Sequence, residues 1–206
     1  MRGFVLSLAF AVGLTLTAPT VASAAFAPLQ YVDIGQAAPQ FSAMAADGKA
    51  HALSDYAGKV VILEWTSPAC QFTAAKYKSG AMQALQRKAA KEGFVWLSVD
   101  TGAPGKPSYL TPAQARARVA KLNAKVTGFL FDVDGKIGRA YGAKTTPSFF
   151  IIGKDGKLAY QGAIDDDWGG PGKTGKKYVA DAIDDLAAGK PVRTPKTRQW
   201  GCEVNY

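Results

Sequence analysis

The segment Val60–Cys70 reads VVILEWTSPAC. Its first part, Val60–Trp65, is an almost continuous apolar run, which is typical of a buried central strand in a parallel sheet. The residues after Cys70 predict one long helix over 71–91, which Gly93 closes. The pattern therefore carries a cysteine from a buried strand to a helix N-terminus, where unpaired N–H groups and a partial positive charge stabilise a thiolate. Such a position lowers a thiol pKa from about 8.5 into a range of about 3.5–7.5.

The rest of the chain alternates strand and helix patterns. A hairpin precedes the Val60 strand, and a β-α-β order follows it, which implies parallel pairing with a right-handed crossover. A late hairpin turned by Asp155-Gly156 adds antiparallel strands. The sequence thus predicts an α/β fold with a central mixed sheet flanked by helices. The expected elements are a hairpin at 41–53, strands at 94–99, 128–132, 148–152 and 157–161, and helices at 111–123, 135–141 and 177–188.

The N-terminus has the pattern of a secretory signal peptide: Arg2, an apolar stretch over 3–16, and Ala22-Ser23-Ala24. The apolar stretch is shorter than the roughly 20 residues that span a bilayer, which disfavours the alternative of a retained membrane anchor. We therefore expect an exported protein, periplasmic or secreted and without stable membrane insertion, in a compartment where disulfides persist. The predicted parts are a signal peptide at 1–24, one domain at 25–190 and a C-terminal tail at 191–206.

Charge and histidine content exclude several classes of function. The net charge of +9 comes from Lys and Arg residues spread along the chain without a long basic block, so nucleic acid is not an expected partner. His51 is the only histidine. The sequence therefore offers neither a Cys–His nucleophile pair nor a multi-histidine metal site, and we expect no metal and no cofactor.

The surroundings of Cys70 favour a reactive thiol over a buried, inert one. Thr66 and Ser67 supply hydroxyl groups close to the predicted helix start. Glu64 lies inside the apolar strand, where an acid must find a partner or take up a proton. A raised pKa would suit Glu64 as a proton donor or acceptor near the thiol. The alternative is a solvated carboxylate at the edge of the strand.

Cys202, in the tail, is the only other cysteine. Two cysteines in an exported domain indicate pairing. A bridge would close a loop of about 130 residues and stabilise the fold by roughly 4–5 kcal/mol in a chain-entropy treatment. A permanent staple, a cycling dithiol and an intermolecular disulfide all stay open. Because the tail has little apolar surface, we expect it to be mobile when Cys202 is unpaired.

Several motifs together resemble the thioredoxin-like superfamily, and within it the redoxin branch, the alkyl hydroperoxide reductase/thiol-specific antioxidant (AhpC/TSA) family. Ile34–Phe41 resembles the family's G-x-x-A-P-x-F lead, and Lys154–Lys157 its late hairpin. Val60–Thr73 and Thr146–Ile152 resemble the segments around its nucleophile and its cis-proline. The likeness covers about residues 35–188. It implies a thioredoxin-like three-layer sandwich.

The resemblance also implies roles for individual residues. Cys70 matches the nucleophilic cysteine and Glu64 a buried acid of related thioredoxins. Pro147 matches the cis-proline, which would leave the Thr146 backbone free to pair with an extended thiol substrate. Thr73 stands where a C-x-x-C motif would have its second cysteine.

The chain also departs from the peroxidase motif P-x-x-x-T/S-x-x-C. Ser67 holds the hydroxyl position, but Leu63 stands where the motif has proline. Thr145 and Thr146 stand where an arginine would precede the late strand, and Arg139 is the candidate to replace it.

Two functions compete at this stage. In the first, the protein is an exported thiol-dependent oxidoreductase or antioxidant: Cys70 attacks a peroxide or a disulfide, Cys202 resolves the product, and an external thiol is the reductant. Thr66, Ser67 and Thr73 would stabilise the thiolate, while Thr146 and Pro147 would bind substrate. In the second, the domain is not catalytic and Cys70–Cys202 is a structural disulfide.

Overall fold

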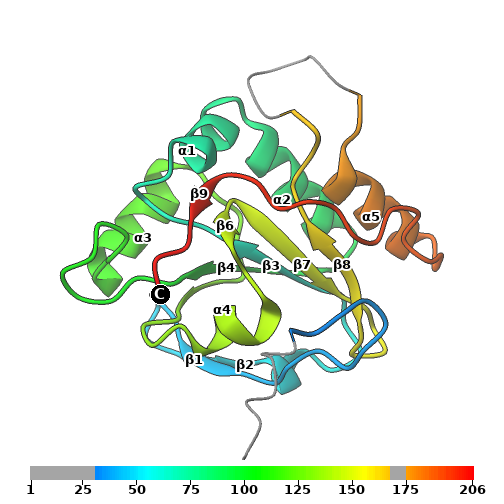
Figure 1. Ribbon diagram of the computed structural model, residues 1–206, viewed down its shortest axis with the longest axis horizontal. Coiled ribbons are helices and arrows are strands. Elements are labelled where there is room, and N and C mark those ends of the chain that lie inside the picture. Colours follow the sequence, from blue (N-terminus) through cyan, green and yellow to red (C-terminus); the bar gives the residue numbers. More distant parts are fainter. Residues whose placement is uncertain (1–30, 168–174) are drawn as a thin grey trace, which may run out of the picture.

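The computed structural model describes residues 31–167 and 175–206 (Figure 1). The predicted signal peptide, 1–24, and its boundary with the domain lie outside the described residues.

A mixed five-stranded sheet forms the centre of the domain, in the order β5-β4-β3-β7-β8. The middle strand, β3, is parallel to β4, and β4 is parallel to β5. On the other side of β3, β7 and β8 continue the sheet in antiparallel fashion. The strands are β3 (Val61–Trp65), β4 (Val95–Asp100), β5 (Gly128–Phe131), β7 (Ser148–Ile152) and β8 (Leu158–Gly162). Every residue of β3 is buried, as its apolar run predicted.

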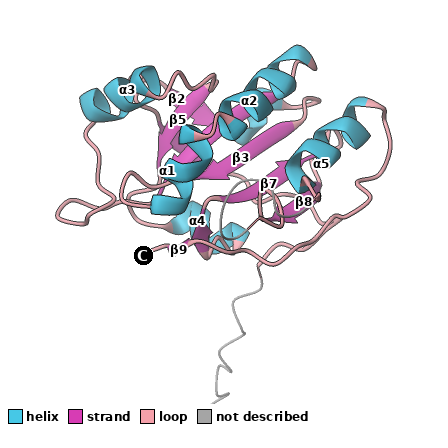
Figure 2. Cartoon of the chain, turned by 90° about the horizontal axis from the view of Figure 1, so that it is seen from above, coloured by secondary structure: helices cyan, strands magenta, loops and turns pink. Residues whose placement is uncertain are grey.

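Helices and a small hairpin cover the two faces of this sheet. One face carries α1 (Gln71–Lys78), α2 (Ala81–Lys91), α3 (Pro112–Lys121) and α5 (Tyr178–Ala187), which Figures 1 and 2 show gathered on one side. The other face carries α4 (Lys136–Tyr141), the hairpin of β1 (Ser42–Met44) and β2 (Ala50–Ala52), and the 3-10 turn η1 (Leu53–Tyr56). The expected three-layer α/β sandwich is confirmed.

Alternate side chains of β3 feed two separate cores. Leu63 and Trp65 pack toward α4, and Ile62 packs toward α1, α2 and α5. This alternation follows from the two-residue period of a strand. Because Glu64 shares the face of Ile62, the strand itself places the carboxyl group beneath α1 and α2.

The single helix expected over 71–91 is wrong: the chain breaks at Ser79 and Gly80 into α1 and α2. Gly80 has φ 80°, in the left-handed region that interrupts a right-handed helix. The Ser79 hydroxyl donates to the Lys76 carbonyl at 3.0 Å, a local bond that competes with the helical pattern. The break lets Tyr77 and Met82, on successive helices, both reach the same core.

The tail is packed onto the domain over its length. It crosses from α5 to β9 (Cys202–Glu203), which pairs antiparallel with β6 (Thr145–Thr146), as Figure 1 shows in red. On the way it bonds to the outer edge of β8, where the Gln161 N–H donates to the Pro195 carbonyl at 2.9 Å. Trp200 is 9% exposed, and its ring meets Phe72 edge-on. The tail therefore has more apolar anchoring in this disulfide-bonded state than its composition indicated.

Candidate functional site

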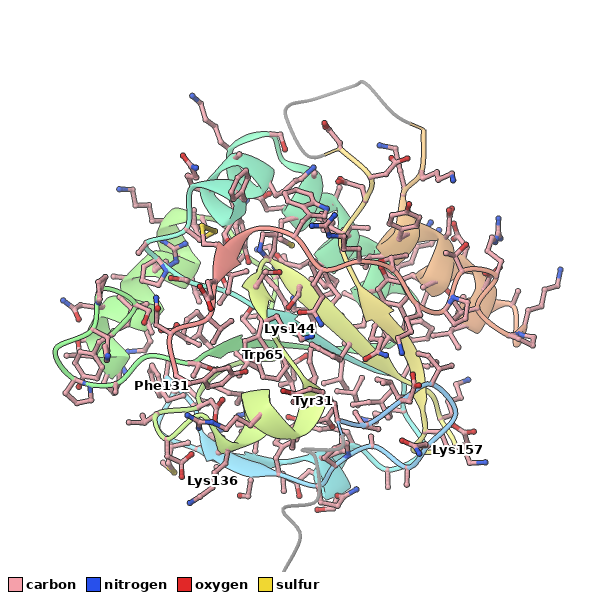
Figure 3. The ribbon with its side chains drawn as sticks, in the orientation of Figure 1. Tyr31, Trp65, Phe131, Lys136, Lys144 and Lys157 are labelled. Atoms are coloured by element: carbon pink, nitrogen blue, oxygen red, sulfur yellow. A yellow bond between two sulfur atoms is a disulfide. The ribbon has the colours of Figure 1, made fainter. Side chains whose placement is uncertain are left out.

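Cys70 and Cys202 form a disulfide (Figure 3). Their Cα atoms lie 5.7 Å apart, although 132 positions separate them in sequence. Cys70 is the N-cap residue of α1, and its carbonyl accepts the first helical bond from the Ala74 N–H at 3.0 Å. The helix N-terminus expected at this cysteine is confirmed. Cys70 is 1% exposed, whereas Cys202 is partly exposed.

Thr146 lies directly against the disulfide. Its carbonyl oxygen is 2.9 Å from Cys70 Sγ, a close contact in the disulfide that becomes a hydrogen-bond acceptor once the sulfur carries a proton. The Thr146–Pro147 peptide bond is cis, as the resemblance implied. In the β6–β9 ladder Thr146 stands opposite Cys202. The tail thus occupies the backbone position at which we expected an extended thiol substrate.

Gly201 makes this close pairing sterically possible. It has φ +139°, a conformation that L side chains rarely adopt, and a Cβ atom there would overlap the Thr146 carbonyl oxygen. Only glycine satisfies both constraints. The sequence Trp200-Gly201-Cys202 therefore combines an aromatic anchor, a residue without a side chain and the reacting sulfur.

The three residues expected to stabilise the thiolate have different surroundings. Ser67 organises the turn before the helix: its Oγ accepts from the Ala69 N–H at 3.2 Å, and its carbonyl accepts from the Cys70 N–H at 3.3 Å. Thr66 is 3% exposed and lines the pocket beside the disulfide together with Ser67. Thr73 is fully buried on α1 and is not among the residues that line that pocket. The structure thus brings Thr66 and Ser67, but not Thr73, to the pocket.

Glu64 is completely buried, so the alternative of a solvated carboxylate is wrong. Trp96 Nε1–H donates to it at 2.8 Å, the Ser98 hydroxyl at 3.0 Å and the Tyr77 hydroxyl at 3.0 Å, with Gln86 Nε2 at 3.5 Å. Burial raises the pKa of Glu64, and these hydrogen bonds oppose the rise. Its partners come from α1, α2 and β4, so the carboxyl group ties both helices to the sheet. A role of Glu64 in proton transfer to the thiol stays a prediction.

A pocket of about 220 Å³ opens beside the disulfide. Polar residues from several segments of the chain converge there. Asp100 and Thr101 lie at the end of β4. Strand β3 runs parallel to β4 and ends at Trp65, which Figure 3 labels, so both strands end at the same edge of the sheet. The pocket wall includes Thr66, Ser67, Cys70, Asp100, Thr101, Ser108, Thr146, Cys202 and Glu203.

Sequence reasoning missed Asp100. This residue is 2% exposed, and Oδ1 has no hydrogen-bond partner among the residues that the structure describes. Burial raises its pKa to about 7, while Arg118 lowers it and Asp132 raises it further. The sequence held one signal that could have identified Asp100: it is an acid at the end of the second buried strand. Because parallel strands present their carboxyl ends at one edge of a sheet, such an acid lies at the same edge as the end of the first strand.

Arg118 on α3 donates to the Ser67 carbonyl at 3.4 Å, at the turn before Cys70. Arg139, the replacement considered from the sequence, donates instead to the Asp134 carbonyl at 2.7 Å. Its guanidinium lies 4.5 Å from the centre of the Tyr206 ring. Neither arginine is among the residues that line the disulfide pocket, but Arg118 reaches the turn before Cys70 through its bond to Ser67.

Three further observations bear on the class of site. A larger hollow of about 670 Å³, beside Phe41, Phe131 and Ile137, includes neither cysteine in its wall. Within the described ranges, no group of three or more His, Cys, Asp or Glu side chains is arranged to hold a metal ion. None of the helices in this part of the chain has the length and hydrophobicity needed to span a bilayer.

We predict that Glu64→Gln changes how stability depends on pH. The raised pKa means that the folded protein keeps a proton that the unfolded chain loses above about pH 4.5. The contribution of Glu64 to wild-type stability therefore falls as pH rises from that value toward the folded pKa, by about 1.4 kcal/mol per unit of elevation. The melting-temperature difference, Glu64→Gln minus wild type, should grow over this range. A difference that is constant with pH would contradict the prediction.

We also predict that Gly201→Ala makes the disulfide easier to reduce. The added methyl group strains the protein only while the tail is docked, that is, in the disulfide-bonded state, at a cost of about 1–3 kcal/mol. Because this strain destabilises the oxidised form, the reduction potential of the disulfide should rise by roughly 20–60 mV. Equilibration in thiol buffers measures this shift. Gly189→Ala is the matched control, because Gly189 has φ +69° but a Cβ atom added there would meet no other atom within 4 Å. Equal shifts in both variants would refute the role of the close contact.

Comparison with known proteins agrees with this geometry. The sequence profile of the AhpC/TSA family matches residues 34–161. No curated protein matches the chain. An uncharacterized conserved protein from Geobacillus kaustophilus shares the fold at 21% identity, with a TM-score of 0.76 over 84% of this chain and 92% of its own.

Two similar structures are closer in sequence. A protein assigned as the thiol:disulfide interchange protein DsbE of Chlorobium tepidum is 29% identical, with a TM-score of 0.51 over 63% of this chain and 84% of its own. An exposed lipoprotein thioredoxin from Streptococcus pneumoniae is 27% identical, with a TM-score of 0.52 over 72% of this chain and 100% of its own. With its mixed sheet, its N-cap cysteine and its profile match, the chain belongs to the AhpC/TSA family of thioredoxin-like proteins.

Proposed function

We propose that this protein is an exported thiol–disulfide oxidoreductase in which Cys70 and Cys202 are a reversible redox pair. One observation carries the proposal: the helix-capping cysteine is joined to a cysteine on a strand that pairs with Thr146, at the wall of a polar pocket. A partner for such chemistry is a protein thiol or disulfide, and the reductant is an external thiol. The sulfur chemistry requires no cofactor.

Exposure sets the direction of reduction. An external thiolate attacks Cys202 Sγ, the sulfur of the more exposed residue, and the S–S electron pair leaves with Cys70 Sγ. Cys70 is the better leaving group, because its thiolate sits at the N-terminus of α1. A second external thiolate then attacks the external sulfur of the mixed disulfide, which releases Cys202 and an oxidised external disulfide.

Substrate turnover reverses these roles. With the tail released, the Cys70 thiolate attacks a substrate disulfide, and one substrate thiolate leaves. The Cys202 thiolate then attacks Cys70 Sγ, which restores the Cys70–Cys202 bridge and frees the second substrate thiolate. While the substrate is bound, its extended backbone takes the place of β9 against Thr146. The tail is therefore both the resolving arm and an intramolecular occupant of the substrate position.

Peroxide reduction is the second candidate. It is favoured by the turn before Cys70, where Ser67 lines the pocket and Arg118 donates to the Ser67 carbonyl at 3.4 Å. Here the Cys70 thiolate attacks the peroxide O–O bond, which gives a sulfenic acid and an alkoxide or hydroxide that takes up a proton. The Cys202 thiol condenses with the sulfenic acid, so that water leaves and the same disulfide forms. The external thiol again reduces it.

Replacing each cysteine by serine distinguishes these reactions. We predict that Cys70→Ser lowers the rate to background in the reduction of insulin disulfides and in the consumption of hydrogen peroxide, each with dithiothreitol as reductant. Cys202→Ser, reduced first and then freed of dithiothreitol, should stop after one turnover because no resolving thiol remains: insulin leaves a mixed disulfide on Cys70, and hydrogen peroxide leaves a sulfenic acid. Intact-mass measurement identifies the trapped adduct.

The structural-disulfide alternative gives a different result. It predicts no rate above dithiothreitol alone in either assay. It also predicts the same loss of stability in both variants, up to about 5 kcal/mol for a loop of this length. That combination of outcomes would overturn the redox proposal.

Export makes its own prediction. Expression of the full chain in a bacterium with a periplasm should give a protein whose N-terminus lies near Ala25, because Ala22-Ser23-Ala24 is a signal-peptidase pattern. Intact-mass analysis of the periplasmic fraction measures this. Uncleaved Met1 in the membrane fraction would contradict it.

A further inference from the structure

Two residues in the wall of the disulfide pocket each carry a buried oxygen that has no hydrogen-bond partner in the described part of the chain. One is Asp100 Oδ1 and the other is Thr146 Oγ1. Asp100 is 2% exposed and Thr146 3% exposed. Buried polar atoms without partners are rare, because each costs about 1–3 kcal/mol. Two of the six such atoms in the described residues belong to the wall of this one pocket, which favours it as a place where polar groups from outside the fold bind.

We propose that Asp100 transfers the proton during thiol–disulfide exchange at Cys70 and Cys202. The inference rests on the proposed function and assigns the group that completes its chemistry. As a carboxylic acid, Asp100 protonates the Cys70 thiolate that leaves when the disulfide is reduced. As a carboxylate, it removes the Cys70 proton before the next attack.

The fold places Asp100 at the same sheet edge as the cysteine. Strands β3 and β4 are parallel, and Trp65 pairs with Val99, so Asp100 stands one residue beyond the end of the register. The Thr66 N–H donates to the Val99 carbonyl at 2.9 Å, which fixes the start of the loop toward Cys70 against the end of β4. The pocket of about 220 Å³ has room for several waters of about 30 Å³ each, which can carry the proton between carboxyl and sulfur.

The charges around Asp100 keep both of its protonation states accessible. Burial favours the neutral acid, and so does Asp132, which follows β5. Arg118 on α3 favours the carboxylate, and Glu203 on β9 is a further acid in the pocket wall. With a pKa of about 7, Asp100 can donate and accept a proton near neutral pH, where such transfer is most effective.

Glu64, the acid singled out from the sequence, has a different environment. Its carboxyl group accepts hydrogen bonds from side chains of α1, α2 and β4, and it is not among the residues that line the pocket. Asp100 has an unpartnered oxygen among the described residues and lies on the pocket wall. The two acids therefore form a matched pair for a test: both are buried, and only one lies at the reacting sulfurs.

The proposed step balances. An external thiolate bonds to Cys202 Sγ, the Cys202–Cys70 bond breaks, and Cys70 receives both the electron pair and the Asp100 proton. The products are a mixed disulfide on Cys202, a Cys70 thiol and an Asp100 carboxylate, which Arg118 stabilises. In the oxidative direction the carboxylate takes the Cys70 proton back.

The test compares Asp100→Asn with Glu64→Gln, which make the same change from carboxyl to amide. Reduction of the disulfide by dithiothreitol is followed from pH 5 to pH 9, and each rate is divided by the dithiothreitol thiolate concentration. The wild-type value should fall as pH rises through about 7, because the acid form of Asp100 is lost. Asp100→Asn should lose this inflection and react about a hundredfold more slowly at pH 6. Glu64→Gln should keep the inflection.

Retention of the inflection by Asp100→Asn, or its loss in Glu64→Gln alone, would overturn the inference. A second measurement uses the wild-type protein and so does not depend on a variant that folds. At pH 6, the rate of disulfide reduction divided by the dithiothreitol thiolate concentration should be lower in D₂O than in H₂O. Equal values in the two solvents would overturn the inference. Neither measurement uses a protein substrate or a peroxide. Failure of the proposed function in the substrate assays is therefore distinct from failure of this proton-transfer step.

Discussion

The parallel pairing of β3 with β4 is the constraint on which the rest of the site depends. Because parallel strands end at the same edge of a sheet, the loop from Trp65 to Cys70 and the carboxyl group of Asp100 open onto one pocket. On the other side of β3, antiparallel β7 starts opposite Trp65, so that Thr146 reaches the same edge. Three segments distant in sequence thus meet at the N-terminus of α1.

The tail closes over this meeting point and joins it covalently through the Cys70–Cys202 disulfide. Cys202 approaches Cys70 on a strand that pairs with Thr146, so the disulfide and the backbone pairing stabilise the same docked arrangement. Burial of Trp200 against Phe72 adds an apolar anchor just before the strand. An external chain must compete with this tethered segment, whose effective concentration is high because it belongs to the same molecule. Reduction of the disulfide removes the covalent part of that advantage.

Two buried acids show how the surroundings divide structural from chemical roles. Glu64 satisfies its oxygens with hydrogen bonds from two helices and a neighbouring strand, and these bonds join the layers of the fold. Asp100 has an oxygen without a partner among the described residues and lines the same pocket as the two cysteines. An apolar strand pattern identified Glu64 as unusual, but the pattern holds no information on which acid reaches the pocket.

The sequence by itself determined the fold class, the β3 strand and the placement of Cys70 at a helix N-terminus, because each depends on local periodicity and on neighbours in the chain. It did not predict the break at Gly80, since a lone glycine in a helical pattern is compatible with a continuous helix. Only the tertiary structure decided that Cys202 docks on Thr146 and that Asp100 faces the pocket. Both depend on which strands pair and in which register, and that is set by packing among segments far apart in the sequence.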